Sequence, residues 1–273
     1  MAISYDMGPD EYNDAPGLRA SDLVYAAQFS WAHLRARPVR PDSDTMRLGR
    51  LHHAMIENPE AAAARFRTDA PTNPATGRVW GRDTQKMAAW LATLPPGVEY
   101  ADPSEVREAR MVAEVVRSHP EAAKLLDGAR HEVSLFGSIE GVQCKARVDI
   151  FHPNRWADIK TTTRAATGFQ REAPHRGYWL QAAFHARVIE AATGCRPSHT
   201  AWIVVEQAPP HGVVVYEAAI EQVMALDVTV SRMVREYAAC VASGSWPGYP
   251  QTAQMIDCPP FVIPSVDQEE VYW

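Results

Sequence analysis

Apolar residues follow a helical period in the first half of the chain. In ASDLVYAAQFSWAHLRAR, residues 20–37, they fall on one face of a helix, with Ser21 and Asp22 as the expected caps. A second helix is expected from about Met46 through Ile56. Helices are also expected near residues 83–93, 103–118 and 119–126. The N-terminal part of the chain is therefore predicted to be mainly helical.

Around residue 130 the apolar period changes from about 3.6 to about 2, which indicates strands. Strands are expected over residues 131–139, 142–151, 155–161, 199–206 and 212–220. Two helical segments, about 165–172 and 177–193, separate the third strand from the fourth, and a last helix is expected over about 220–242. This order predicts an α/β fold with a central mixed β-sheet flanked by helices.

The chain has 273 residues, of which 46% are hydrophobic, and this is enough for one domain with its own core. We expect a single domain in three parts: a mainly helical part over 1–128, a sheet core over 129–242 and a proline-rich tail over 243–273. The polar amino terminus lacks the apolar core of a signal peptide, and no apolar run approaches the roughly 20 residues of a membrane helix. A cytoplasmic protein without a membrane span is expected.

The net charge of −6 argues against a protein that coats nucleic acid through its whole surface, but it leaves room for a local basic groove. Residues 33–50 and 160–179 are locally basic. The four cysteines, Cys144, Cys195, Cys240 and Cys258, form no CxxC pair, so we expect reduced structural thiols. An iron–sulfur cluster bound by all four is the alternative.

The stretch CKARVDIFHPNRWADIKTTT, residues 144–163, predicts two strands joined by a turn over residues 152–155. Pairing across this turn would set Asp149 opposite Asp158 and Arg147 opposite Lys160, with opposed Cβ atoms roughly 5 Å apart. The alternate positions of the first strand are apolar and are expected to face one core together: Ala146, Val148 and Ile150.

Two opposed carboxylates in a half-buried cleft repel each other unless a cation lies between them. Mg²⁺ takes oxygen ligands and keeps several waters, which suits phosphodiester hydrolysis. Lys160, two residues after Asp158, would lie beside such an ion, where it would orient water or stabilise charge on a phosphate. A surface salt-bridge cluster is the alternative, because the D-x8-D-x-K pattern is short.

The VD…DIK pattern, with apolar strands around it and a helix after it, resembles the PD-(D/E)xK nuclease core. Neighbouring segments resemble the RecE-like exodeoxyribonuclease VIII family. GLRASDLVYAAQFSWAHLRAR resembles its opening helix, LGRLHHAMIENPE its G-x-x-x-H motif, GYWLQAAFHARV its Q-x-x-x-Y helix and GSWPGY its closing tail. The resemblance covers about residues 17–260, and its specificity lies in the order of several short motifs.

Carried over position by position, the resemblance implies a site on the two strands and two helices. The catalytic residues would be Asp149, Asp158, Lys160 and Gln181, and the metal ligands would be His53, Asp149, Asp158 and the main-chain carbonyl of Ile159. His52 competes with His53 for the metal. The implied cofactor is Mg²⁺, and since imidazole is a softer ligand than oxygen, Mn²⁺ should substitute.

The sequence departs from the family pattern at three positions. Val148 replaces the proline of the PD half, Phe261 replaces a tail tryptophan, and His185 replaces the tyrosine of Q-x-x-x-Y, with Tyr178 earlier in the same helix as its substitute. DNA contacts are expected from Lys145, Arg147, Thr161, Thr162, Arg164, Tyr178 and His185. Glu132 would either approach the metal or be solvated, and Trp156 and Trp179 would either stack on bases or pack in the core.

The resemblance implies an exonuclease that degrades linear double-stranded DNA from its ends, 5′ to 3′, leaving 3′ single strands. It also implies a ring-shaped homo-oligomer and a phage-type single-strand annealing recombinase as partner, in DNA recombination and repair. One alternative is a RecB- or Cas4-like single-strand nuclease module, whose relatives often bind an iron–sulfur cluster. Another is a catalytically inactive DNA-end-binding protein.

Overall fold

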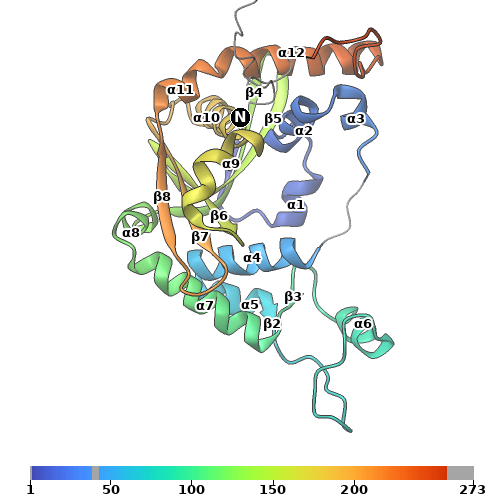
Figure 1. Ribbon diagram of the computed structural model, residues 1–273, viewed down its shortest axis with the longest axis vertical. Coiled ribbons are helices and arrows are strands. Elements are labelled where there is room, and N and C mark those ends of the chain that lie inside the picture. Colours follow the sequence, from blue (N-terminus) through green and yellow to red (C-terminus); the bar gives the residue numbers. More distant parts are fainter. Residues whose placement is uncertain (1, 39–42, 257–273) are drawn as a thin grey trace, which may run out of the picture.

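A six-stranded sheet forms the centre of the protein, in a computed structural model that describes residues 2–38 and 43–256 (Figure 1). The strand order is β1-β4-β5-β6-β7-β8, and only β6 and β7 run parallel among the paired neighbours. The strands are β1 (Ala2–Ser4), β4 (Arg130–Ile139), β5 (Val142–His152), β6 (Arg155–Thr162), β7 (His199–Glu206) and β8 (Val213–Ala218). The predicted mixed α/β sheet is confirmed.

Helices cover both faces of this sheet and bury two separate cores, because each face carries its own set of apolar side chains. The α10 core lies against α2 (Ala20–Gln28), α10 (Tyr178–Thr193) and α12 (Asp227–Ser243), and it includes Leu23, Phe184 and Val234. The α4 core lies against α4 (Asp44–Glu57) and α7 (Pro103–Ser118), and it includes Leu51, Ile56 and Val112. Figure 1 shows α10 and α12 toward the top and α4 and α7 toward the bottom.

Shorter elements connect these layers. They are α1 (Pro9–Asp14), α3 (Trp31–Arg35), α5 (Pro59–Arg65), α8 (Pro120–Leu126), the 3-10 turn Ala166–Gly168, α9 (Phe169–His175) and α11 (Ile220–Ala225). A small lobe with its own core of Ala70, Met87 and Tyr100 contains β2 (Phe66–Arg67), β3 (Glu99–Tyr100) and α6 (Gln85–Leu91). The part that was expected to be mainly helical also contains three strands, of which β1 belongs to the main sheet.

Two expected helices are each divided in two. The first ends at Gln28, and Ser30 starts α3 by accepting a hydrogen bond at 3.2 Å from the His33 N–H. The N-cap of α2 is Arg19, and Asp22 contributes to the cap from the first turn by accepting from the N–H of Arg19 at 3.1 Å. The last helix breaks at Leu226, between α11 and α12. Apolar periodicity alone did not indicate either break, because both halves of each pair contribute to the same core.

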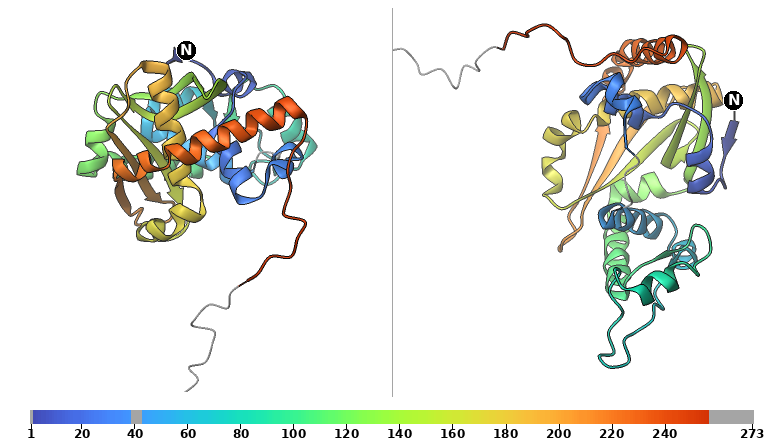
Figure 2. Two further views of the ribbon diagram at one scale, coloured as in Figure 1. Left: turned by 90° about the horizontal axis from the view of Figure 1, so that it is seen from above. Right: turned by 90° about the vertical axis from the view of Figure 1, so that its right-hand side faces the viewer.

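The chain after α12 first packs on α3 and then leaves the body (Figure 2). The Ala32 N–H donates to the Pro247 carbonyl at 2.9 Å, and the rings of His33 and Tyr249 lie 4.8 Å apart. The expected tail positions Cys258 and Phe261 lie outside the described residues. Among the described residues, no helix is both long and apolar enough to cross a membrane.

Gly177 allows α10 to begin directly against α2. It has a φ of 71°, and a Cβ at this position would lie 2.6 Å from Cγ1 of Val24. Gly128 has a similar φ of 66° but nothing within 4 Å of such a Cβ. Substituting each glycine in turn therefore distinguishes the cost of backbone strain, which both positions share, from the cost of crowding, which only Gly177 has.

We expect Gly177→Ala to lower the free energy of unfolding more than Gly128→Ala does. Both substitutions place a side chain at positive φ, at a cost of roughly 1–2 kcal/mol. Only Gly177→Ala adds an overlap with Val24, which costs about 1–3 kcal/mol more. Urea denaturation of the two variants measures the difference, and equal losses would show that Val24 moves aside freely.

Candidate metal and nuclease site

The β5–β6 hairpin holds the centre of the candidate site. Its paired register, His152↔Arg155, Phe151↔Trp156 and Ile150↔Ala157, is the predicted one. The recorded pairing ends at Ile150, and the Asp149 carboxylate then accepts a hydrogen bond at 2.7 Å from the Ile159 N–H. The Asp149 side chain therefore replaces a main-chain hydrogen bond between the two strands. The expected cross-strand pairs, Asp149 with Asp158 and Arg147 with Lys160, do not form.

The neighbouring pair of strands is irregular at the same level. His131 pairs with Ile150 and Val133 with Val148, while Glu132 between them has a φ of 52°. Positive φ is uncommon for a residue with a side chain. Across this point the strand changes the face that it buries, because Val148 packs in the α10 core and Ile150 in the α4 core. The expectation that Ala146, Val148 and Ile150 form one set was wrong for Ile150.

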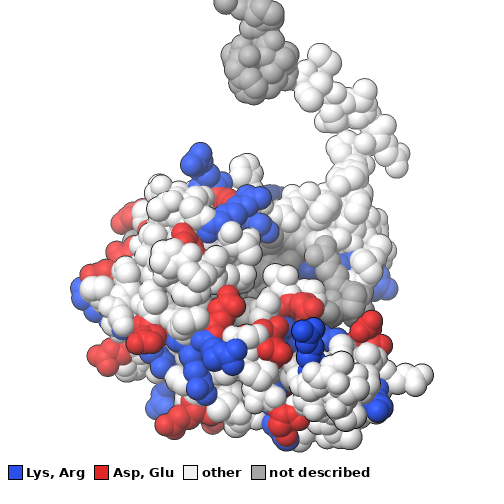
Figure 3. Space-filling model, turned by 60° about the horizontal axis from the view of Figure 1, so that its bottom comes forward, with Lys and Arg blue, Asp and Glu red and all other residues white. Residues whose placement is uncertain are grey.

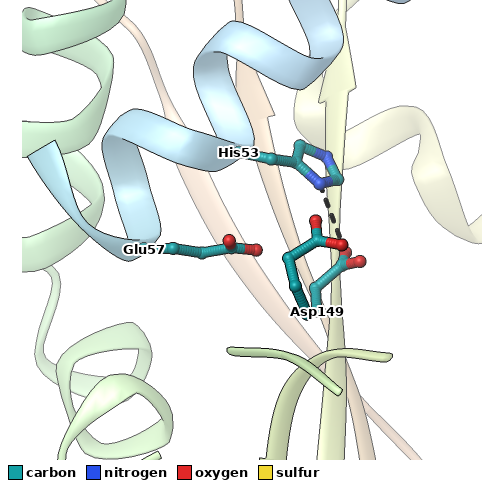
Figure 4. A group of neighbouring side chains, drawn as sticks. His53, Glu57 and Asp149 are labelled. Atoms are coloured by element: carbon teal, nitrogen blue, oxygen red, sulfur yellow. Dashed lines mark ion pairs between the residues drawn. The ribbon is translucent and has the colours of Figure 1, made fainter. Parts of the chain in front are cut away.

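Helix α4 brings two further ligating side chains to this point. His53 and Glu57 are four residues apart and so lie on one face of the helix, as Figure 4 shows with both side chains directed toward Asp149. His53 Nδ1 lies 3.5 Å from Asp149 Oδ2. Ligand atoms of His53, Glu57, Glu132 and Asp149 all lie within 4.8 Å of one another. These four residues are called the acidic group below.

The electrostatics of the acidic group favour the binding of a cation. Burial, together with the charges of Glu132 and Asp149, raises the pKa of Glu57 well above its usual range. Burial, with the charges of Asp158 and Glu132, does the same to the pKa of Asp149. Burial lowers the pKa of His53, which keeps the imidazole neutral and able to ligate. A divalent ion would remove the repulsion between the carboxylates.

The donor set fits a hard or borderline divalent ion. Three carboxylates supply oxygen ligands, as Mg²⁺ and Mn²⁺ prefer, and one neutral imidazole adds a nitrogen. The Ile159 main chain lies against this set, since its N–H donates to the Asp149 carboxylate at 2.7 Å. Of the two competing histidines, His53 belongs to the acidic group, whereas His52 does not belong to it and is only 2% exposed.

Asp158 and Lys160 form a second part of the site. Lys160 Nζ is ion-paired with Asp158 Oδ2 and donates to Gln181 Oε1 at 3.4 Å, and Gln181 Nε2 donates to Asp158 Oδ1 at 3.3 Å. Burial alone would lower the pKa of Lys160, but the charges of Asp158, Tyr178 and Asp149 outweigh it and the pKa is raised. Lys160 is therefore a fixed cation, and Asp158 lies outside the acidic group in this arrangement.

A cavity of about 240 Å³ opens beside Lys160. Four residues that were predicted to contact DNA line it, together with Arg176 and Phe169: Thr161, Thr162, Arg164 and Tyr178. The Tyr178 ring lies 4.5 Å from Lys160 Nζ and stacks on Phe169, with centroids 5.5 Å apart. The tertiary structure thus brings these four predicted residues together with the predicted catalytic lysine.

Three other residues predicted to contact DNA have different roles. Lys145 is 2% exposed and donates three hydrogen bonds to main-chain carbonyls near the amino terminus. His185 is buried and lies against Trp156, with ring centroids 5.1 Å apart. Arg147 binds Glu132 and the Met7 carbonyl. A DNA contact at Lys145 or His185 is contradicted, because neither side chain reaches the surface.

The structure also shows where the remaining candidate residues lie. Glu132 approaches the candidate metal site, while Trp156 packs in the α10 core and Trp179 packs edge-on against Trp202. Glu57 was missed, although its spacing of four residues from His53 was a signal in the sequence. Burial raises the pKa of Cys144 to about 12 and also raises that of Cys240.

The surface has no uniform charge on the face that Figure 3 shows, where small groups of basic and acidic side chains alternate. This agrees with the net charge of −6. Favourable contacts with a polyanion would then come from local groups such as the residues around Lys160, and less from the surface as a whole.

Residues 25–259 match the family described as "PDDEXK-like domain of unknown function (DUF3799)". The chain belongs to this PDDEXK-like family. A crystal structure of a protein described as a "Putative exonuclease" from Eubacterium rectale has the same fold, with a TM-score of 0.59 and 12% identity over 93% of this chain and 96% of that one. No curated protein matches the sequence.

The PDDEXK-like fold accounts for the arrangement of the strands. The predicted PD-(D/E)xK superfamily is confirmed, and the closer likeness to RecE-like enzymes stays a prediction. In this PDDEXK-like chain, Asp149, Asp158 and Lys160 occupy the two strands of the hairpin, at the point where the hairpin separates. His53 and Glu57 add the ligands of a helix from the opposite side.

We expect Glu57→Gln to make the metal-free protein more stable and to weaken its binding of divalent ions. The substitution removes one of three neighbouring carboxylates whose repulsion raises the pKa of Glu57 and Asp149. Thermal unfolding with EDTA and with Mn²⁺ measures both effects, with Glu114→Gln on the exposed face of α7 as the control. A variant that is less stable in EDTA but gains as much from Mn²⁺ as the wild type would contradict the role of Glu57.

Proposed function

We propose that this chain is a divalent-metal-dependent nuclease that hydrolyses phosphodiester bonds of DNA. One observation carries the proposal: three carboxylates and a neutral imidazole converge beside the Asp158–Lys160 ion pair, at the separation of the β5–β6 hairpin. The membership in a PDDEXK-like family supports it. A salt-bridge cluster does not account for this arrangement: among the described residues Lys160 pairs with Asp158 and Arg147 with Glu132, but no lysine or arginine forms an ion pair with Glu57 or Asp149.

The proposed roles follow from the positions of the side chains. His53, Glu57, Glu132 and Asp149 would hold a divalent ion, with Asp158 and the Ile159 carbonyl at its edge. A divalent ion bound there supplies Lewis acidity to the phosphodiester and lowers the pKa of a bound water. Lys160 keeps its proton, donates to a phosphate oxygen or to the attacking water, and stabilises the negative charge that develops. Gln181 holds Lys160 and Asp158 in place.

The finer proposal concerns the substrate. The resemblance of the motifs supports exonuclease action on linear double-stranded DNA, 5′ to 3′, by a ring-shaped homo-oligomer that works with a single-strand annealing recombinase. The side chains of Thr161, Thr162 and Arg164 line the cavity beside Lys160 and would bind the phosphates next to the scissile bond. The mixed charge of the face in Figure 3 suits a protein that binds DNA through a restricted surface.

Cleavage of linear duplex DNA labelled at either the 5′ or the 3′ ends tests this proposal. We expect wild-type protein in Mg²⁺ or Mn²⁺ to release the 5′ label early in short products, and to be inactive in EDTA. Asp149→Asn and Lys160→Met should each lower the rate by about 10³ or more, equivalent to roughly 4 kcal/mol of barrier. Asp149→Asn should also lose metal binding, whereas Lys160→Met should retain it.

Lys124→Ala is the control for these variants, because Lys124 is exposed and pairs only with Glu121 on the surface. Early release of the 3′ label would reverse the proposed polarity. Full activity of Lys160→Met would remove Lys160 from the mechanism. Intact DNA with folded, metal-loaded wild type would support the alternative of an inactive DNA-end-binding protein.

We further expect Tyr178 to act through Lys160. The ammonium group lies over its ring at 4.5 Å, and such contacts contribute about 0.5–2 kcal/mol. Tyr178→Leu should therefore lower the turnover rate by roughly 2- to 30-fold at saturating DNA, while Tyr178→Phe, which keeps the aromatic face, should retain most of it. Equal losses in the two variants would instead assign the role to the hydroxyl group.

A further inference from the structure

The N-terminal segment, residues 2–18, lies along the edge of the sheet next to the acidic group. β1 pairs with β4 from Ala2↔Phe136 to Ser4↔Ser134, and Leu18 forms a bridge with Cys144 of β5. Figure 2 shows the N-terminus at the outer side of the sheet. This segment precedes residues 25–259, which match the family. Its role is therefore a property that the family description does not cover.

Two basic side chains of β5 bind the main chain of this segment. Lys145 Nζ donates to the carbonyl oxygens of Tyr12, Asn13 and Ala15, at 2.6, 3.0 and 2.5 Å. Its ammonium group also lies 4.7 Å from the centre of the Tyr12 ring. A buried ammonium group needs such acceptors, so Lys145 fixes the C-terminal end of α1 against the sheet.

Arg147 binds the same segment nearer its start and connects it to the acidic group. Its Nη1 donates to the Met7 carbonyl at 2.9 Å and to Ser134 Oγ at 3.3 Å, and its Nε donates to Glu132 Oε2. The Arg147 side chain is only 16% exposed. A guanidinium group has donors in a fixed plane, so a contact on one edge restrains the contact on the other.

Glu132 needs such a restraint more than the other members of the acidic group do. His53 and Glu57 project from a regular helix, and Asp149 is held by the Ile159 N–H. Glu132 instead lies at the irregular point of β4, with a φ of 52°. Side chains that bind metals are usually oriented by a second hydrogen-bonding partner, and the loss of that partner weakens metal binding.

We propose that Arg147 is a positioning residue that keeps the Glu132 carboxylate within reach of His53, Glu57 and Asp149, and that the segment 2–18, through the Met7 carbonyl, completes this metal site. The inference rests on the proposed function, because it assumes that the acidic group binds a divalent ion. A carboxylate has two oxygens and about four lone-pair sites. Glu132 can therefore accept a hydrogen bond from Arg147 and bind an ion at the same time.

Isothermal titration of Mn²⁺ into the full-length protein, without DNA, tests the proposal. Arg147→Gln should raise the dissociation constant by about 10- to 100-fold. Arg147→Lys keeps the charge but cannot bridge Met7 and Glu132 in the same plane, and its loss should be smaller. Deletion of residues 1–8 removes the Met7 carbonyl and should weaken Mn²⁺ binding by several-fold with Arg147 still present.

Arg235→Gln is the matched control, because Arg235 forms an ion pair with Glu140 at 3.0 Å on the surface, with no residue of the acidic group involved. Thermal unfolding in EDTA identifies any variant that fails to fold. If Arg147→Gln does not fold, Mn²⁺ binding by Arg147→Lys tests the inference in its place. Equal or tighter Mn²⁺ binding by folded Arg147→Gln would overturn the inference and leave the proposed nuclease standing. Wild-type protein that binds Mn²⁺ at no measurable level would overturn both.

Discussion

Repulsion between partly buried carboxylates is the constraint on which the candidate site depends. Glu57, Glu132 and Asp149 come from a helix and two strands and meet where none of them is fully solvated. Carboxylates in such a place are stable only if they take up protons or share a cation. Burial, and then the charges of neighbouring carboxylates, raise the pKa of Glu57 and of Asp149 well above the usual range. Sites of this kind are found where function requires charge, and rarely where stability alone is selected.

The separation of β5 from β6 explains how both faces of one sheet contribute to one site. Asp149 bridges the gap to the Ile159 N–H and meets His53 and Glu57 from α4. Lys160, one residue further along β6, is held by Gln181 from α10, a helix of the other core. The acidic group and Lys160 thus approach the site from opposite layers, and Lys160 lies beside an open cavity.

The amino-terminal segment is bound to the sheet by specific contacts. β1 covers β4, and Lys145 and Arg147 of β5 both bind the chain that follows β1. Alternation along a strand predicted that Lys145, Arg147 and Asp149 share a polar face, and a DNA contact was the natural reading of two basic residues there. The amino-terminal segment occupies that place instead. A polar strand face can bind a ligand or another part of the same chain, and periodicity does not distinguish the two.

The sequence by itself determined the α/β class, the five strands that follow residue 130, the turn at Pro153-Asn154 and the candidate residues Asp149, Asp158 and Lys160, because period, turn residues and the D-x8-D-x-K pattern are local signals. It also indicated His53 through a motif. It did not indicate Glu57 or the burial of His185, and it left open whether Glu132 approaches the site. Only the tertiary structure decided these, since they depend on where α4 crosses the sheet and on the irregular point at Glu132. Contacts between residues distant in sequence leave no periodic signal, and here they determine which polar side chains meet and which are buried.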